Sequence, residues 1–464
     1  MMADANGGGA LWQLSVTEAS QRIAAGTLSP VDLVEACLAR IEAVDGMIHS
    51  FIHVAADAAR AAAREAEAEI KAGRLRGPLH GIPYGVKDNY DAAGMPAAAG
   101  SRVRLDHVPV EDAALIAQLK RAGAILLGKL NTWEFGTGNG GEYFDLPFPT
   151  ARNAWDPERF AGGSSTGTGT SVAAGTTLFA LGSDTTGSVR LPASATGTLG
   201  LIATSDVLDR SGILPNCYTL DKPGILAWTA ADAALILGEL APAAKPSAAA
   251  RSLAGLRIAV VTDPGLGLPQ PDQPLAEAFA AAVALLSSQG AIVETVAMPV
   301  SVADCFAVSR LIGPPESAAI HEKELRERPS ELGFALRDKL MAGSLVSAVD
   351  YIAAQRRRAQ IADAIDALIG RYDALVTYGP LHVAPRLGVE PEMTAFTTET
   401  MLTPFNLSDH PALMQCIGFT EAGLPLCWQI VGNRHAETTI LALAAAYEER
   451  TPWRARRAMT EARP

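Results

Sequence analysis

Hydrophobic side chains near the start of the chain recur every three or four residues, which is the spacing of one face of an α-helix. After Pro30 this spacing is kept by Leu33, Val34, Cys37, Leu38, Ile41 and Val44. Ser15 with Glu18 matches a capping box, and Ser29 before Pro30 places a capping residue ahead of a proline at the first helical position. Residues 12–75 are therefore predicted to be helical.

From residue 80 onward the hydrophobic residues form short runs separated by helix-like stretches. Runs of this length, bounded by Gly, Pro and Asp, are typical of strands buried in a sheet that helices cover on both faces. The predicted strands are Ile82–Val86, Ala124–Leu127, Leu178–Leu181, Leu199–Ala203, Arg257–Val261, Ile292–Met298, Ala374–Tyr378 and Leu424–Val431. Residues 302–370 return to a charged helical pattern and are predicted to form a mainly helical excursion from the sheet.

Composition and charge narrow the classes of partner. The 464 residues are 48% hydrophobic and 19% charged, which is typical of a globular chain with a substantial core. The net charge is −12, and the densest basic clusters, 356–358 and 454–457, lie in or beside helical patterns. A nucleic-acid surface needs clustered Lys and Arg, so we interpret these clusters as solvated helix faces and expect no nucleic acid among the partners.

The chain also lacks the patterns of metal, disulfide and membrane proteins. Its five cysteines are widely spaced and include no C-x-x-C pair, which favours reduced thiols in a cytoplasmic protein. The eight histidines are scattered along the chain, so we expect no metal and no cofactor. No apolar run is long enough to cross a bilayer, and the first residues lack the pattern of a signal peptide, so we expect no membrane partner.

Two glycine-rich motifs resemble nucleotide-binding loops but lack the required context. GTGNGG at 136–141 fits G-x-G-x-x-G, yet the EYFDLPFP that follows is a poor start for the helix that a dinucleotide site requires. GAILLGKL at 123–130 places Leu130 where a P-loop needs Ser or Thr to hold magnesium. We interpret the first motif as a glycine-rich loop and the second as a strand.

Three segments carry features typical of a reaction site: GIPYGVKDN (81–89), GGSSTGTG (162–169) and GSDTTGSVRLP (182–192). Small hydroxyl residues among glycines leave backbone N–H groups open, and such groups are what an oxyanion hole requires. Lys87 follows a buried apolar run, so we expect it to be poorly solvated. Desolvation lowers the pKa of a lysine, and a fall of about 3 units from roughly 10.4 would make it a base near neutral pH.

In this order the three segments resemble the amidase signature family, which uses a Ser–cis-Ser–Lys triad within one large α/β domain. The resemblance spans most of the chain and also includes AILLGKLNTWEF, ARNAWDPERFAGG, PFNLSDHPAL and GLPLCWQIVG. It implies a single domain over residues 11–464, with a central mixed β-sheet covered by helices on both faces. Residues 1–10 are predicted to be a flexible lead-in.

Residue by residue, the resemblance implies that Ser188 is the nucleophile, Ser164 the bridging serine and Lys87 the base. A serine hydroxyl is a weak nucleophile that needs a base within reach, and a second serine can relay its proton to a lysine. The resemblance also implies a cis peptide bond before Ser164. The implied oxyanion hole consists of the backbone N–H groups of Thr185, Thr186, Gly187 and Ser188, and the implied supporting residues are Gly163, Ser165, Asp184 and Arg190.

Two residues depart from the family pattern. Thr166 and Thr186 stand where the family usually has glycine. Only the N–H group of Thr186 is needed in the predicted oxyanion turn, so the mechanism can carry over. Its side chain would narrow or tilt the acyl site, so the identity of the substrate does not follow from the resemblance.

Three functions follow from these residues. The leading hypothesis is a free-standing amidase that hydrolyses small or aryl amides through a Ser188 acyl-enzyme, with esters and carbamates (urethanes) as further substrates and a homodimer as one option for its assembly. The first alternative is the A subunit of a tRNA-dependent amidotransferase, which would have glutaminase-like activity and need partner subunits. The second alternative is a non-catalytic scaffold that keeps the amidase fold.

Overall fold

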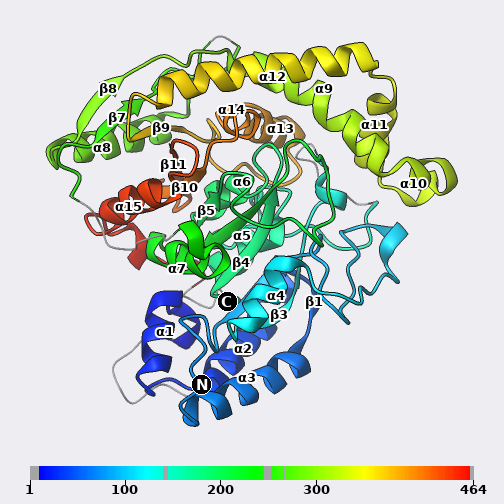
Figure 1. Cartoon of the computed structure of the whole chain (residues 1–464), viewed down its shortest axis with the longest axis vertical. Helices are drawn as coiled ribbons and strands as arrows, with labels where there is room; N and C mark the ends of the chain where they lie inside the picture. The colour runs from blue at the N-terminus through cyan, green and yellow to red at the C-terminus, as the bar shows by residue number, and fades with distance from the viewer. Residues whose placement is uncertain (1–9, 139–144, 245–251, 266, 460–464) are drawn as a thin grey trace.

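The short apolar runs of the sequence pair side by side into one mixed sheet. The computed structural model describes residues 10–138, 145–244, 252–265 and 267–459, and within these residues the sheet has 11 strands in the order β1-β3-β2-β4-β6-β5-β10-β11-β9-β7-β8. Pairing is parallel around β2 and around β7 and antiparallel elsewhere. The predicted α/β fold with a central mixed sheet is confirmed (Figure 1).

Eight of the strands lie where the sequence predicts them, and three do not. The strands are β1 Phe51–Val54, β2 Pro83–Lys87, β3 Ile125–Leu130, β4 Phe179–Asp184, β5 Leu199–Ile202, β6 Lys222–Ala227, β7 Arg257–Val260, β8 Ile292–Thr295, β9 Ala374–Tyr378, β10 Ala412–Phe419 and β11 Pro425–Val431. The prediction of helices over residues 12–75 misses β1, an edge strand whose sequence Phe-Ile-His-Val is only partly buried and forms no uninterrupted apolar run. β6 opens with Lys-Pro-Gly and β10 contains a buried glutamine, and both features obscure an apolar run.

Helices pack against this sheet and extend beyond it. They are α1 Val16–Ala24, α2 Pro30–Ile48, α3 Ala56–Lys71, α4 Ala114–Arg121, α5 Thr166–Ala174, α6 Arg190–Thr196, α7 Ala230–Leu240, α8 Gln273–Ser288, α9 Val302–Ile320, α10 Glu322–Glu327, α11 Phe334–Ser344, α12 Ala348–Ile369, α13 Glu390–Thr398, α14 Thr403–Leu407 and α15 Glu437–Glu448. Ser15 and Ser29 cap α1 and α2 as predicted. None of the described helices combines the length and the hydrophobicity that a membrane span requires.

The helices at the two ends of the molecule have different places in the fold. In Figure 1, α1, α2 and α3 lie at one end, and α12 runs across the other end above the sheet. The segment from α9 to α12 is helical, and α9 packs against α11, α12 and α14. This segment therefore packs mainly on itself and on α14, a helix from the C-terminal part of the chain.

Two of the three candidate site segments, 81–89 and 182–192, include the ends of neighbouring parallel strands. β2 and β4 pair in parallel, with Val86 opposite Leu181, so Lys87 and Asp184 leave the sheet at the same edge. The third segment runs from Gly162 into α5, which contacts β2, β3 and β4. The sheet therefore brings together residues about 100 positions apart in sequence.

Candidate functional site

Lys87 ends β2 with its side chain fully buried. Its Nζ lies 2.7 Å from Ser164 Oγ and 2.9 Å from Ser183 Oγ, and it is 3.5 Å from the Ser183 carbonyl oxygen. All of these partners are neutral, and no carboxylate of the described residues forms an ion pair with Lys87. A buried lysine in this setting interacts only with hydroxyl and carbonyl groups.

The missing counter-charge sets the protonation state of this lysine. Burial lowers the pKa of Lys87 to about 7, because the ammonium form loses its hydration. The more distant carboxylates of Asp221 and Asp184 raise the pKa and oppose this effect only in part. A large fraction of the amine is therefore neutral near pH 7 and able to accept a proton.

The two adjacent serines are held by backbone contacts on either side of them. The peptide bond between Gly163 and Ser164 is cis, as the resemblance implies. The Ser165 N–H donates to the Ser188 carbonyl oxygen at 3.1 Å, and the Ser165 hydroxyl donates to the Ser183 carbonyl oxygen at 3.1 Å. A Cβ atom on Gly163 would lie 2.2 Å from the ring of Trp133, so only glycine fits there. The segment is thus fixed against both the β4 end and the turn that carries Ser188.

Ser188 lies in the turn between β4 and α6 and lines a cavity of about 130 Å³. Its side chain makes no hydrogen bond to another described residue. The cavity also contacts Trp133, Gly136, Gly163, Thr185 and Thr186, which belong to the predicted site or its neighbouring loop. The hydroxyl of Ser188 is therefore presented to a space that a small substrate can enter.

A buried ion pair fixes the turn that carries Ser188. Arg190 binds Asp184 through Nε at 3.1 Å and Nη2 at 3.0 Å, and both side chains are fully buried. Burial alone would raise the pKa of the Asp184 carboxyl, but Arg190 and a hydrogen bond from Asn406 lower it to about 2. Arg190 also donates to the Leu402 carbonyl oxygen and to Gln429 Oε1. These contacts join the turn to the C-terminal part of the chain.

The backbone N–H groups of this turn differ in whether a hydrogen bond within the protein already occupies them. The Gly187 N–H donates to Asp184 Oδ1 at 2.7 Å, so this group is not free to serve an oxyanion, and its inclusion in the predicted hole is corrected. The carboxylate that braces the turn is the physical reason. No hydrogen bond from the N–H of Thr185, Thr186 or Ser188 to a described residue is found. Those three groups remain the candidates for an oxyanion hole.

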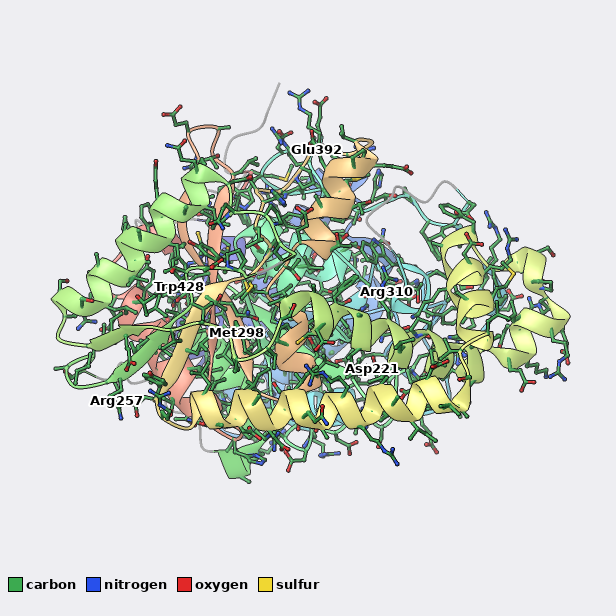
Figure 2. All side chains as sticks on the ribbon, turned by 90° about the horizontal axis from the view of Figure 1, so that it is seen from above. Asp221, Arg257, Met298, Arg310, Glu392 and Trp428 are labelled. Atoms are coloured by element: carbon green, nitrogen blue, oxygen red, sulfur yellow. The ribbon has the colours of Figure 1, made fainter. Side chains whose placement is uncertain are left out.

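The opposite wall of the cavity comes from the helical segment and carries positive charge. Arg310 of α9 and Lys339 of α11 both line the cavity, and the lining that the structure describes includes no carboxylate. Lys339 donates to Asn216 Oδ1 at 2.6 Å and to Thr137 Oγ1 at 3.1 Å. Burial lowers the pKa of Lys339 to about 8, so it is mostly charged at pH 7. Figure 2 shows Arg310 in the middle of the molecule, far from Arg257 at one end of the sheet.

Sequence reasoning brought some of these residues together and missed others. The structure places Lys87 against Ser164, as predicted. No hydrogen bond joins the hydroxyls of Ser164 and Ser188 among the described residues, and the two segments meet instead through the Ser165 N–H and the Ser188 carbonyl oxygen, a contact that was not predicted. Ser183 lies inside a quoted segment, so a signal for it existed. Arg310 and Lys339 carry no local signal, because a helical arginine or lysine is typical of any surface helix.

A mixed α/β sheet with a buried lysine against a serine pair defines an amidase-type protein. A family model described as Amidase matches residues 32–441, so the chain belongs to the amidase signature family. It is accordingly an amidase-family enzyme acting on carbon–nitrogen bonds. Within the part of the chain that the structure describes, no group of three metal-ligating side chains is placed to hold a metal ion.

Known proteins resemble this chain over nearly its whole length. It is 33% identical over 485 aligned positions to the A subunit of the glutamyl-tRNA(Gln) amidotransferase of Chloroflexus aggregans, covering 96% of this chain and 98% of that relative. Among solved structures, one described as a crystal structure of amidase superposes with a TM-score of 0.86 at 31% identity, over 94% of this chain and 100% of that one. The native peptide amidase from Stenotrophomonas maltophilia gives a TM-score of 0.82 at 27% identity, over 94% and 96%.

Proposed function

We propose that this chain hydrolyses amides through an acyl-enzyme on Ser188, with Ser164 as proton relay and Lys87 as base. The observation that carries the proposal is the contact between Ser164 Oγ and an amine whose pKa burial lowers to about 7, so that about half of it is neutral at pH 7. A serine nucleophile needs such a base within hydrogen-bond reach. The turn that carries Ser188 is joined to the serine pair by one backbone hydrogen bond, which the N–H of Ser165 donates to the Ser188 carbonyl oxygen.

The proposed chemistry has two halves. Ser188 Oγ attacks the carbonyl carbon while its proton passes through Ser164 to Lys87, and the N–H groups of Thr185, Thr186 and Ser188 are the donors available to the developing oxyanion. The lysine then returns a proton through Ser164 to the departing nitrogen, and the carbon–nitrogen bond breaks. Water attacks the ester in the same way, releases the carboxylic acid and restores Ser188.

The charge of the cavity supports a substrate whose acyl half carries an anionic group. Arg310 and Lys339 line the cavity together with Ser188, and the described lining includes no carboxylate to neutralise them. A carboxylate on the substrate would complete this arrangement, because paired charges are favoured where solvation is poor. Glutamine is one amide that carries such a group.

The curated relatives support the same substrate. Their name, the A subunit of a glutamyl-tRNA(Gln) amidotransferase, favours the first alternative over hydrolysis of small or aryl amides. We therefore propose a glutaminase-type amidase, and by the same likeness a chain that works together with partner subunits. Activity of the isolated chain decides between assembly with partners and independent action.

A second candidate function rests on the apolar part of the same cavity. Trp133, Leu191, Leu220 and Phe306 contribute to its lining and would suit an uncharged aryl amide, ester or carbamate. Arg310 and Lys339 would then have no charged partner on the substrate. The two candidates differ in the effect expected when that charge is removed, which should weaken turnover of an anionic substrate and leave turnover of an uncharged one unchanged.

The test compares glutamine with an uncharged amide of similar size on the purified chain. We expect ammonia release from glutamine in the wild type, none in Ser188→Ala, and a rise in KM for glutamine of about tenfold or more when Arg310→Met removes a charge from the cavity. The uncharged amide should be unaffected by Arg310→Met. Efficient turnover of the uncharged amide alone would replace the glutaminase-type proposal with the second candidate. Absence of both turnover and acylation by a sulfonyl fluoride, with and without partner subunits, would leave the scaffold hypothesis.

A further inference from the structure

Asn216 lies in the wall of the Ser188 cavity and has no part in the proton transfers of the proposed function. Lys339 Nζ donates to Asn216 Oδ1 at 2.6 Å, and the Thr137 hydroxyl donates to the same oxygen at 3.3 Å. Because an ammonium group can only donate hydrogen bonds, the contact with Lys339 fixes the orientation of the amide. The amide nitrogen therefore faces the other way, where it donates to Thr185 Oγ1 at 3.2 Å.

The hydrogen bonds continue from Thr185 to a carboxyl group. Thr185 Oγ1 accepts from Asn216 and itself donates to Asp221 Oδ1 at 2.6 Å. Asp221 Oδ2 accepts the backbone N–H groups of Asn216 and Cys217, at 2.7 Å and 2.9 Å. The hydrogen bonds of the side chains thus run in one direction, from Lys339 through Asn216 and Thr185 to Asp221. A displacement of one of these side chains would break its hydrogen bond to the next.

The two ends of the Asn216 amide contact different parts of the proposed site. Thr185 lies in the turn that carries Ser188, and its N–H is one of the three groups available to an oxyanion. An ammonium group has three N–H donors, and among the described residues Lys339 uses two of them, on Asn216 and Thr137. Because Lys339 also lines the cavity, an acceptor on the substrate can reach the third donor.

An asparagine at this position holds Lys339 without neutralising its charge. The amide oxygen is uncharged, and the lysine ion pairs found among the described residues do not include Lys339. An aspartate of the same size would form an ion pair with Lys339, and its carboxylate could not donate to Thr185. The amide therefore combines two properties that an aspartate lacks.

We propose that Asn216 is a positioning residue that sets the specificity for an anionic acyl group, because it presents Lys339 to that group and holds Thr185 in the turn. This inference rests on the proposed function and names the residue that positions one of its two cavity cations. A substrate carboxylate binds the third N–H of Lys339 while the same asparagine holds the turn. An uncharged substrate uses only the contact of Asn216 with Thr185.

The test uses variants that break one contact or both, and two measurements. Steady-state kinetics with glutamine, with partner subunits added if turnover requires them, report on Lys339, and the rate at which the uncharged reagent phenylmethylsulfonyl fluoride modifies Ser188 reports on Thr185. Asn216→Asp should raise KM for glutamine about tenfold or more, because the new carboxylate neutralises Lys339, whereas Thr185→Val should leave that KM within about twofold. Both variants should slow the sulfonylation of Ser188 by a similar factor of about three or more, because both break the hydrogen bond between Asn216 and Thr185.

Two further variants guard against an effect on folding alone. Lys339→Met should raise KM for glutamine as Asn216→Asp does, and leave sulfonylation within about twofold, because the contact of Asn216 with Thr185 remains. Ser317→Ala is the matched control, because the Ser317 hydroxyl contacts the carbonyl oxygen and Oδ1 of Asn216 without contacting Lys339 or Thr185. It should leave both measurements unchanged.

The outcomes separate this inference from the proposed function. An unchanged KM for glutamine in folded Asn216→Asp or Lys339→Met would overturn the role of Asn216 in specificity, and normal sulfonylation of Asn216→Asp would overturn its link to the turn. Equal losses in Ser317→Ala would also overturn the inference, because Asn216 would then have a structural role only. In each case the wild type still hydrolyses glutamine and the proposed function stands. A wild type that is sulfonylated but does not hydrolyse glutamine would refute the proposed substrate, and one that does neither would refute the proposed function.

Discussion

Two buried lysines on neighbouring strands show what distinguishes a proposed base from a structural cation. Lys87 ends β2 and Lys129 lies in β3, and the two strands pair in parallel with Val86 opposite Lys129. Both side chains are fully buried. Lys129 forms an ion pair with Asp88 Oδ1 at 3.2 Å and donates to the Tyr90 carbonyl oxygen at 2.5 Å, whereas Lys87 contacts only hydroxyl and carbonyl oxygens.

The comparison teaches that burial alone does not make a base. Burial lowers the pKa of both lysines, but at Lys129 the carboxylate of Asp88 opposes that effect from bonding distance. The carboxylates that act on Lys87 belong to Asp221 and Asp184, and neither forms an ion pair with it. Asp88 directly follows Lys87 in sequence, yet its side chain turns to the other lysine. The sequence neighbour of a residue is therefore no guide to its electrostatic partner.

Replacing each of the two lysines by methionine in turn should give the largest difference between a loss of activity and a loss of stability. Lys87→Met should lower kcat/KM about 10²–10⁴-fold, because general base catalysis is lost, and change the free energy of unfolding by about 1 kcal/mol or less. Lys129→Met should instead lower the free energy of unfolding by about 3–5 kcal/mol, because Asp88 is left buried without a counter-charge. Denaturant unfolding and steady-state kinetics on both variants check this. Normal activity in Lys87→Met would break the comparison, and Lys129→Met combined with Asp88→Asn should recover much of the stability.

Removing the leading distant carboxylate should have a moderate effect on Lys87. Asp221 is half-buried and accepts hydrogen bonds from Thr185 Oγ1 at 2.6 Å and from the N–H of Asn216 at 2.7 Å. Its negative charge raises the pKa of Lys87, so Asp221→Asn should lower that pKa. Because Lys87 acts as the neutral amine, the rise of activity with pH should move to lower pH by about one unit or less. A shift to higher pH in a folded variant would contradict the assignment.

The smallest expected effect is a change of stability with pH that comes from a partly exposed histidine, whose pKa is raised where that of Lys87 is lowered. His382 lies between Asp272, at 3.1 Å, and Glu399, at 2.5 Å, and these carboxylates raise its pKa to about 8. A raised histidine pKa stabilises the fold fully below the ordinary value of about 6.5, and that stabilisation is lost as the pH rises through 8. The free energy of unfolding should fall by about 2 kcal/mol or less across this interval. His382→Gln should abolish the change, and a change that persists would assign it to another group.

The sequence predicted those features that depend on residues close together along the chain, namely single strands and the motif segments. The apolar runs predict eight strands, and the motifs place Lys87, Ser164 and Ser188 in segments that the sheet then brings to one edge. Local spacing could not show that Asp184 occupies the Gly187 N–H, because that depends on how the turn closes around the carboxylate. It also could not show β1, an edge strand whose sequence Phe-Ile-His-Val is only partly buried and forms no uninterrupted apolar run.

Residues contributed by distant helices had no signal of their own. Arg310 and Lys339 both reach the Ser188 cavity from α9 and α11, which pack against each other, and α9 also packs against α14. Their charge decides between an anionic and a neutral substrate in the proposed function. The loop GTGNGG lies partly outside the described residues, which end at 138 and resume at 145. The predicted lead-in at residues 1–10 falls almost wholly outside them.

The protonation of the Lys87 amine can be measured directly by NMR titration of lysines labelled with carbon-13 at Cε. Lys87→Met assigns the resonance, and Lys129 on the adjoining strand serves as the internal reference for a buried, paired lysine. We predict that the Lys87 signal titrates with a pKa of about 7, together with the rise of kcat/KM. A Lys87 signal that remains that of an ammonium group up to a pH of about 10 would contradict the account.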